Sequence, residues 1–136
     1  MKTLSILGLL MIVISACTSQ KAIVKINSNQ QALVNDSIVY ELLVSDPQFE
    51  TWFVTNYSSA KDHSESYYHD WNNQYVTDWN YHFMIGHLPD VFENYIDYDY
   101  NTDYGIELNR KLYYYFRYVE TYLKVPILLV GKKYTT

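Results

Sequence analysis

The sequence predicts an α+β fold, mainly helical with a small β-sheet, made of about four helices and two or three short strands. Three observations favour it. The 136 residues suffice for one domain, several stretches repeat apolar residues at helical spacing, and residues 38–44 form a β-branched and aromatic run typical of a buried strand. Apolar residues make up 49% of the chain and charged residues 18%, which is the balance of a folded chain. We expect one globular domain over residues 38–131.

The first sixteen residues have the organisation of a secretory signal peptide. Lys2 precedes an apolar run over residues 4–14, which is too short to cross a bilayer as a helix, and small residues follow it. Residues 14–17, Ile-Ser-Ala-Cys, resemble the bacterial lipobox, which implies cleavage before Cys17 and acylation of that residue. The alternative is an ordinary signal peptide in which Cys17 is incidental. We therefore expect acyl chains on Cys17 to hold the protein on a membrane.

Composition and the residues after Cys17 indicate where the protein acts. Residues 18–20, Thr-Ser-Gln, contain no acidic cluster, which resembles lipoproteins that stay on the periplasmic side, so we expect a lipid-anchored envelope protein of the outer membrane. A formal net charge of -5 and a pI near 5.2 argue against a nucleic-acid partner. The single Cys excludes an intrachain disulfide and a Cys-based zinc site. The sequence leaves the oligomeric state open.

The region between the anchor and the first helix is divided by composition. Residues 17–37 are polar and lack a strong period, so we interpret them as a lipidated, flexible tether with a strand near residues 22–26. After the strand described above, Asp46 and Pro47 provide an N-cap and a first helical position. Aromatic residues at helical spacing then predict a helix over residues 47–55.

A longer helix is expected over residues 64–85. An aromatic stripe runs along it, formed by Tyr68, Trp71, Tyr75, Trp79, His82 and Phe83. The triplet Asp-Trp-Asn occurs twice within it, at residues 70–72 and 78–80. We interpret the repeat as core packing with Asp and Asn at the helix edges, and the alternative is an aromatic platform for a carbohydrate or peptide.

The remaining predicted elements are a short helix over residues 89–96, a turn-rich acidic segment over 97–105, a helix over 106–123, an edge strand over 125–130 and a basic tail over 132–136. The last helix ends before Pro126, because the residue before a proline disfavours helical geometry. An edge strand tolerates that proline, so we expect residues 125–130 to pair with the strand at 38–44.

The chain contains 16 tyrosines, and some of them form the predicted binding surface. The candidates are Tyr114, Tyr118 and Tyr122, at i, i+4 and i+8 on the flank of the last helix away from its apolar face, and Tyr98, Tyr100 and Tyr104 in the acidic segment. Exposed aromatic rows are uncommon on monomers and often mark contact surfaces. We expect these residues to bind an envelope protein or a glycan.

The acidic segment spaces oxygen donors by two residues, as the first half of an EF-hand loop does. These donors are Asp97, Asp99, Asn101 and Asp103. Thr102 stands where the loop needs Gly, and Leu108 stands where it needs a bidentate Glu. We therefore expect a solvated loop whose side chains cap turns, with a calcium site as the alternative and no other cofactor.

Catalytic signatures are missing from the sequence, so the leading hypothesis is a non-catalytic binding or accessory protein. Asp78 and His82, at i and i+4, form a candidate carboxylate–imidazole pair. One alternative is therefore a small envelope hydrolase or metal-dependent enzyme that uses this pair together with residues 97–103. Another is a structural subunit of an outer-membrane assembly.

Several unusual motifs lie between residues 40 and 116. They are Tyr-Glu-Leu at 40–42, Asp-Pro-Gln-Phe-Glu-Thr-Trp at 46–52, Tyr-Val-Thr-Asp-Trp-Asn at 75–80, Tyr-Ile-Asp-Tyr-Asp at 95–99, Tyr-Gly-Ile-Glu-Leu-Asn at 104–109 and Lys-Leu-Tyr-Tyr-Tyr-Phe at 111–116. In these motifs the chain resembles an uncharacterised family of short Bacteroidetes lipoproteins. The resemblance implies an envelope lipoprotein and supplies no catalytic residue.

Overall fold

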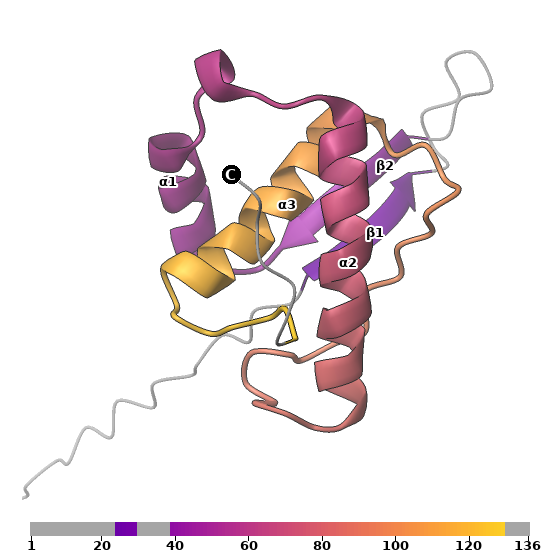
Figure 1. Ribbon diagram of the computed structural model, residues 1–136, viewed down its shortest axis with the longest axis vertical. Helices are drawn as coiled ribbons and strands as arrows, with labels where there is room; N and C mark the ends of the chain where they lie inside the picture. The colour runs from indigo at the N-terminus through magenta and orange to yellow at the C-terminus, as the bar shows by residue number, and fades with distance from the viewer. Residues whose placement is uncertain (1–23, 30–38, 130–136) are drawn as a thin grey trace, which may run out of the picture.

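The computed structural model describes residues 24–29 and 39–129, which form a small α+β domain (Figure 1). In chain order its elements are β1 (Val24–Asn29), β2 (Val39–Val44), α1 (Pro47–Asn56), a short 3₁₀ helix (Ser59–Lys61), α2 (Glu65–Met84) and α3 (Gly105–Thr121). The predicted fold class is confirmed. The signal segment, Cys17 and the basic tail lie outside the described residues.

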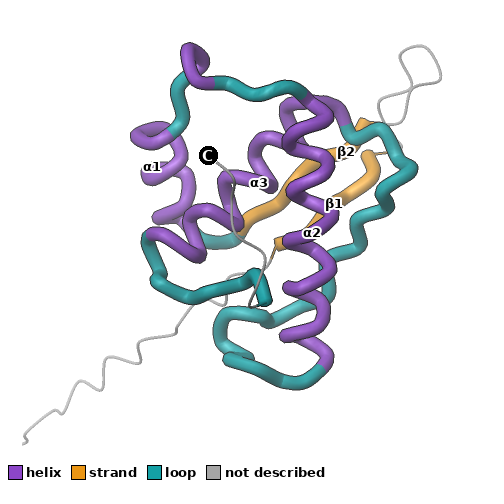
Figure 2. Tube along the Cα trace, in the orientation of Figure 1, coloured by secondary structure: helices purple, strands orange, loops and turns teal. Residues whose placement is uncertain are grey.

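The sheet consists of two antiparallel strands, shown side by side in Figure 2, with Val24 opposite Val44 in the register. Side chains alternate along the strands, so Val24 and Leu42 are buried while Lys25 is exposed. The expectation of a flexible tether is therefore wrong for residues 24–29, because β1 contributes a buried side chain to the core. The strand expected at residues 22–26 exists but begins and ends later.

The three α-helices of the described residues form at the predicted positions. Asp46 caps α1 by accepting a hydrogen bond from the Gln48 amide, and Pro47 occupies the first helical position. Ser64 caps α2 by accepting a bond from the Tyr67 amide. Helix α3 contacts α2 and, separately, α1 and β2, so it is the central element of the domain (Figure 1).

Aromatic side chains dominate the core between these helices. The large side chains with less than 2% exposure include Phe49, Tyr68, Tyr75, Trp79, Phe92, Tyr115, Phe116 and Tyr118. Three of them, Tyr68, Tyr75 and Trp79, belong to the predicted stripe along α2, so core packing is confirmed for these residues, whereas Phe83 at the end of the stripe is exposed. The expectation that Asp and Asn of the repeat lie at the helix edges is wrong for Asn72, Asp78 and Asn80, because all three are buried. The rings meet in stacked and edge-on pairs, for example Tyr75 stacked on Phe116 with centroids 4.9 Å apart.

The chain leaves α2 through a Schellman turn. The His87 amide donates to the His82 carbonyl and the Gly86 amide to the Phe83 carbonyl, while Gly86 adopts the left-handed conformation this turn requires, with φ of 66°. The helix predicted over residues 89–96 is not formed. Leu88 also has a positive φ, of 43°, and its carbonyl closes one isolated turn with Val91 before the chain extends.

Asparagine side chains account for this extended path. The Asn80 amide group donates to the Ile96 carbonyl at 2.9 Å, and its oxygen accepts from the Ile96 amide at 2.8 Å. Asn94 makes the same pair of bonds with Val24, at 2.7 and 3.3 Å. Each carboxamide replaces the backbone of a neighbouring strand, so the segment needs no regular secondary structure to satisfy its buried polar groups.

Side chains of α2 and α3 hold the segment after α3 in the same way. Glu120 accepts from the amides of Ile127 and Leu128, at 3.2 and 3.4 Å, and Asp78 accepts from the Leu129 amide at 3.0 Å. Burial raises the pKa of Glu120, and these amides oppose that shift. The expected pairing of residues 125–130 with the strand at 38–44 is therefore wrong for the described part, residues 125–129, because carboxylates accept from the amides of residues 127–129 and the Val119 carbonyl accepts from that of Val125.

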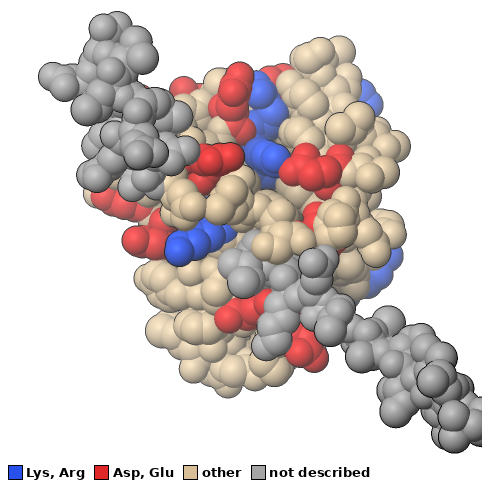
Figure 3. Space-filling view, turned by 180° about the vertical axis from the view of Figure 1, so that it is seen from behind, with Lys and Arg blue, Asp and Glu red and all other residues tan. Residues whose placement is uncertain are grey.

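The surface is unevenly charged. Exposed apolar side chains gather where α2 ends, and they include Tyr81, Phe83, Met84, Ile85 and Leu88. On the face seen in Figure 3, the lower end of the domain carries few charged side chains compared with the upper part. Within residues 24–29 and 39–129, every helix is too short or too polar to cross a membrane.

Candidate functional site

The predicted tyrosine row on α3 lies along α1, and its members differ in exposure. Tyr118 is fully buried and donates to Asp46 at 2.8 Å, so the expectation of an exposed row is wrong for this residue. Tyr114 is half-buried, whereas Tyr122 is 51% exposed and donates to Gln48 at 3.1 Å. The row was expected on a free flank, but α3 packs α2 on one side and α1 on the other.

Trp52 of α1 lies above this row and separates two open hollows. Its ring meets Tyr118 edge-on with centroids 5.5 Å apart, and the half-buried side chain lines both hollows. The first hollow, of about 520 Å³, is lined by Pro47, Gln48, Thr51, Trp52, Thr55, Asn56 and Tyr122. The second, of about 310 Å³, is lined by Trp52, Asn56, His63, Tyr113, Tyr114, Arg117 and Thr121.

Polar groups flank the aromatic rings in both hollows. Gln48 uses its carbonyl oxygen to bind the Tyr122 hydroxyl, and Asn56 uses its amide nitrogen to bind the Trp52 carbonyl at 2.8 Å. Among the described contacts, the Gln48 nitrogen and the Asn56 oxygen therefore remain for a ligand. Arg117 supplies a cation beside the second hollow and lies 3.6 Å from Glu120. Flat rings and hydrogen-bonding amides thus line one continuous surface.

The loop that closes the second hollow is fixed by an ion pair. Asp62 accepts hydrogen bonds from Arg110, from Tyr68 at 2.5 Å and from Tyr57 at 3.3 Å. The Arg110 guanidinium also lies over the Tyr57 ring, 5.2 Å from its centroid. The bond from Arg110 is the main reason that the pKa of Asp62 falls to about 2. The neighbouring His63 is positioned as a consequence, with its ring stacked on Tyr67 at 4.0 Å.

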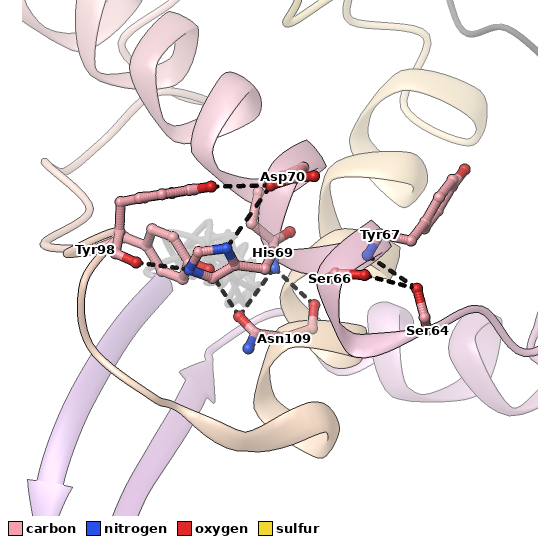
Figure 4. Close-up of polar contacts among 9 residues, drawn as sticks. Ser64, Ser66, Tyr67, His69, Asp70, Tyr98 and Asn109 are labelled. Atoms are coloured by element: carbon pink, nitrogen blue, oxygen red, sulfur yellow. Dashed lines mark hydrogen bonds and ion pairs between the residues drawn. The ribbon is translucent and has the colours of Figure 1, made fainter.

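A third hollow, of about 410 Å³, lies between the start of α2 and the acidic segment. Its lining is polar and consists of Glu65, Ser66, His69, Tyr100, Asn101, Thr102, Asp103 and Asn109. Figure 4 shows His69 and Asp70 of α2, Asn109 of α3 and Tyr98 converging on this region. His69 donates from Nε2 to the Tyr100 carbonyl at 2.7 Å, which ties the acidic segment to α2.

The three tyrosines of the acidic segment mostly face the protein. Tyr98 is half-buried, donates to Asn109 at 2.8 Å and stacks on Tyr104, and burial raises its pKa. Tyr104 accepts from the Asp99 amide at 2.9 Å. Tyr100 is 47% exposed, and its hydroxyl donates to Asp70, which raises the tyrosine pKa. Tyr100 is therefore the most accessible of the three to a partner.

Two of the predicted calcium ligands, Asp99 and Asp103, act as turn caps. Asp99 accepts from the Asn101 amide at 2.9 Å and from the Thr102 hydroxyl at 3.2 Å, and these bonds lower its pKa. Asp103 accepts from the Gly105 amide at the start of α3, at 3.0 Å. Asp97 is exposed. Within the described ranges, groups of three or more His, Cys, Asp or Glu residues do not converge as metal ligands would.

Asp78 and His82, the candidate catalytic pair, both hold the segment after α3. Asp78 is 2% exposed and binds the Leu129 amide, and His82 is 9% exposed and donates from Nε2 to the Ile127 carbonyl at 2.8 Å. The His82 ring also stacks on Phe92, with centroids 4.5 Å apart. These contacts make the two residues part of the packing of the domain.

Sequence reasoning missed the contribution of α1 to the site. Trp52 entered the prediction only as one of the aromatic residues at helical spacing in residues 47–55, without a role in binding. One signal pointed to the surface, because Trp is too large to be fully buried in most proteins and here precedes the polar residues Thr55 and Asn56.

Comparisons with known proteins give one finding. The sequence model of a protein family described as "Family of unknown function (DUF6146)" matches residues 4–131, nearly the whole chain. Comparison with curated proteins and with solved structures gives no significant match.

Proposed function

The chain belongs to the DUF6146 family, which has no known function, and we propose that it is a non-catalytic, glycan-binding lipoprotein of the cell envelope. In this proposal Cys17 carries the acyl chains, and the ligand is held by the two hollows on either side of Trp52. The half-buried Trp52 side chain, which lines both hollows, is the observation that carries the proposal.

The size of the hollows favours a small ligand unit over a protein surface. Their volumes, about 520 and 310 Å³, lie within or near the range of about 300–1,000 Å³ found for small-molecule sites. A stable protein–protein interface instead buries about 800 Å² on each partner. Two adjoining hollows of this size suit consecutive sugar units of one chain.

The chemistry of the lining also suits a sugar. Trp and Tyr rings offer flat apolar faces with polar edges, on which the C–H face of a pyranose ring can stack. The Gln48 nitrogen and the Asn56 oxygen supply one donor and one acceptor for sugar hydroxyls at the rim. Arg117 adds a cation beside one hollow, which favours a glycan that carries a carboxylate or phosphate near that end.

The test measures glycan binding by residues 17–136 carrying Cys17→Ser, so that binding is separate from lipidation. Soluble peptidoglycan fragments and the polysaccharide of lipopolysaccharide are titrated while heat and tryptophan fluorescence are recorded. We expect one of them to bind and Trp52→Ala to weaken it at least about tenfold, a loss of about 1.4 kcal/mol. The control Tyr95→Ala removes a ring that is 55% exposed outside both hollows and leaves binding unchanged.

Two outcomes would overturn the proposal. The first is equal binding by the wild type and Trp52→Ala. The second is capture of an envelope protein from solubilised membranes in a Trp52-dependent manner without glycan binding, which would make the hollows a protein site. Capture that does not depend on Trp52 would favour a structural subunit of an assembly.

A further inference from the structure

The end of α2 exposes apolar side chains that the packing of the domain does not need. Met84 is 68% exposed, Ile85 57%, Leu88 44% and Phe83 37%, and we call residues 83–88 the α2 tip. Over residues 81–91, Asp90 is the only Asp, Glu, Lys or Arg. A group of exposed apolar side chains with a single charged residue nearby is uncommon on a monomer and often marks a surface that contacts a partner or a membrane.

Contacts within the domain fix the conformation of the α2 tip. The Schellman turn at Gly86 fixes the backbone, and the ring of His87 lies against that of His82, with centroids 5.0 Å apart. Leu88 keeps a left-handed conformation, with φ of 43°, which is strained for a residue that has a Cβ. Strain of this kind persists where the surroundings enforce it and is frequent at functional sites. The tip is therefore a fixed projection rather than an unfinished helix end.

The tip lies at the end of the domain where the described chain begins. Val24 is bonded to the Asn94 side chain, and the Asn94 carbonyl accepts from the Trp79 indole nitrogen at 2.9 Å. Trp79 precedes Met84 by five residues on α2, so the start of β1 adjoins the last turns of that helix. Figure 1 shows the loop after α2 projecting beyond the sheet and α3 at this end.

The length of chain before Val24 sets how far the tip can be from the anchor. Cys17 precedes Val24 by seven residues, and seven extended residues span at most about 25 Å. An anchored Cys17 therefore keeps Val24 within about 25 Å of the bilayer surface, a distance shorter than the thickness of the bilayer, about 40 Å with its headgroups. A domain anchored through Cys17 thus stays beside the membrane, with its apolar end close to the lipid.

We propose that the α2 tip inserts into the interfacial region of the bilayer that carries the Cys17 acyl chains. This inference rests on the lipid anchor of the proposed function. Met84, Ile85 and Leu88 enter the boundary between headgroups and acyl chains, which removes their apolar surface from water. The anchor confines the tip near lipid, so a weak intrinsic affinity suffices. The insertion fixes which end of the domain faces the membrane.

The test exploits the single cysteine of the chain. Residues 17–136 with Cys17→Ser carry an N-terminal hexahistidine tag, which binds them to phosphatidylcholine vesicles that contain a nickel-chelating lipid. The tag takes the place of the lipid anchor, so the result does not depend on whether Cys17 is lipidated in the cell. An environment-sensitive dye is attached to Met84→Cys or, as the control, to Val54→Cys on α1, where the side chain is 77% exposed. We expect a blue shift and protection from an aqueous quencher at position 84 alone.

A second pair of variants tests the same contact without a dye. In the untethered protein, Ile85→Asp is expected to lower partition onto vesicles at least about tenfold, whereas Val54→Asp leaves it unchanged. A dye at position 84 that stays accessible to the quencher on tethered vesicles would overturn the proposal. So would a dimer in solution that Ile85→Asp dissociates and vesicles leave intact, because a second copy would then cover the tip.

The lipid anchor is tested separately, by mass spectrometry of Cys17 in protein expressed in a bacterial host that processes lipoproteins. An unmodified Cys17 together with a blue shift at position 84 would refute the anchor and keep insertion. A diacylglyceryl-modified Cys17 with no shift at position 84 would support the anchor and refute insertion.

Discussion

Arg110 of α3 binds both carboxylate oxygens of Asp62, with Nε 3.0 Å from Oδ1 and Nη2 2.5 Å from Oδ2. The two residues are 48 positions apart, and their pair fixes the loop between α1 and α2 to the first turns of α3. That loop carries His63 into the second hollow. The ion pair therefore connects the stability of the domain to the shape of the proposed binding surface.

Asp62→Asn is expected to destabilise the domain by about 1–3 kcal/mol at pH 7, because charge-assisted hydrogen bonds to the carboxylate are lost. The pKa of Asp62 is lowered from 3.8 to about 2, so its contribution is complete well above pH 4 and is lost progressively as the pH falls through about 2. Denaturant unfolding of both proteins between pH 2 and 7 measures the difference. A difference that stays constant over this range would contradict the assignment, and Asp90→Asn, on the exposed loop, is the control.

Asn80→Asp tests the carboxamide that holds the extended segment before α3. At pH 7 an ionised Asp keeps an acceptor for the Ile96 amide but places a negative charge against the Ile96 carbonyl. We expect a loss of about 2–4 kcal/mol, since a buried polar pair is broken and a charge is buried. Acidification protonates the carboxyl group, restores a donor and reduces the loss.

The measurement for Asn80→Asp is thermal or denaturant unfolding at pH 7 and pH 4, compared with the wild type at each pH. Asn73→Asp on the same helix is the matched control, because this side chain is exposed and should change stability little at either pH. A penalty for Asn80→Asp that does not shrink at pH 4 would argue against the paired bonds with Ile96.

Helices with one apolar face could be predicted from the sequence, but the elements that pack against each helix could not. Tyr75 and Trp79 were placed in the core because they share a stripe on α2. Tyr118 was placed on the surface because it lies off the Leu112 face of α3. The amphipathic pattern assumes one buried face, whereas α3 is covered by α2 and by α1, so its buried surface extends around to the tyrosine row.

The predictions for the irregular segments were wrong for a different reason. Residues 89–96 and 125–129 contain apolar residues at spacings that suit a helix or a strand. Their backbone groups instead bind side chains such as Asn80 and Glu120, which are separated from them by 7–16 residues along the chain. Sequence periodicity reports local repetition and carries no information on such pairings. The same limit hid Trp52, whose two hollows exist because α1 packs on α3.

Gly86→Ala is expected to destabilise the domain by about 1 kcal/mol, because φ of 66° is costly for any residue with a Cβ. A Cβ at this position meets no atom within 4 Å, so the loss contains no steric clash and reports backbone strain less the gain from a more restricted unfolded chain. Denaturant unfolding gives the value, with Asn73→Ala as an exposed helical control. A loss below a few tenths of a kcal/mol would mean that the Schellman turn rearranges, and the dye at position 84 would then report a changed α2 tip.

Alkaline titration tests how the tyrosines are buried. Burial raises the pKa values of Tyr68, Tyr98, Tyr113, Tyr115 and Tyr118 above the ordinary value of 10. The neutral form is favoured in the folded state, so stability from these groups is complete below pH 10 and is lost as the pH rises above it.

Absorbance at 295 nm should rise in two phases, the later one coinciding with the loss of the helical circular dichroism signal. In denaturant all 16 tyrosines should titrate together. Tyr115→Phe, at a position only 1% exposed, should reduce the later phase alone, and a single phase with native circular dichroism would contradict the aromatic core.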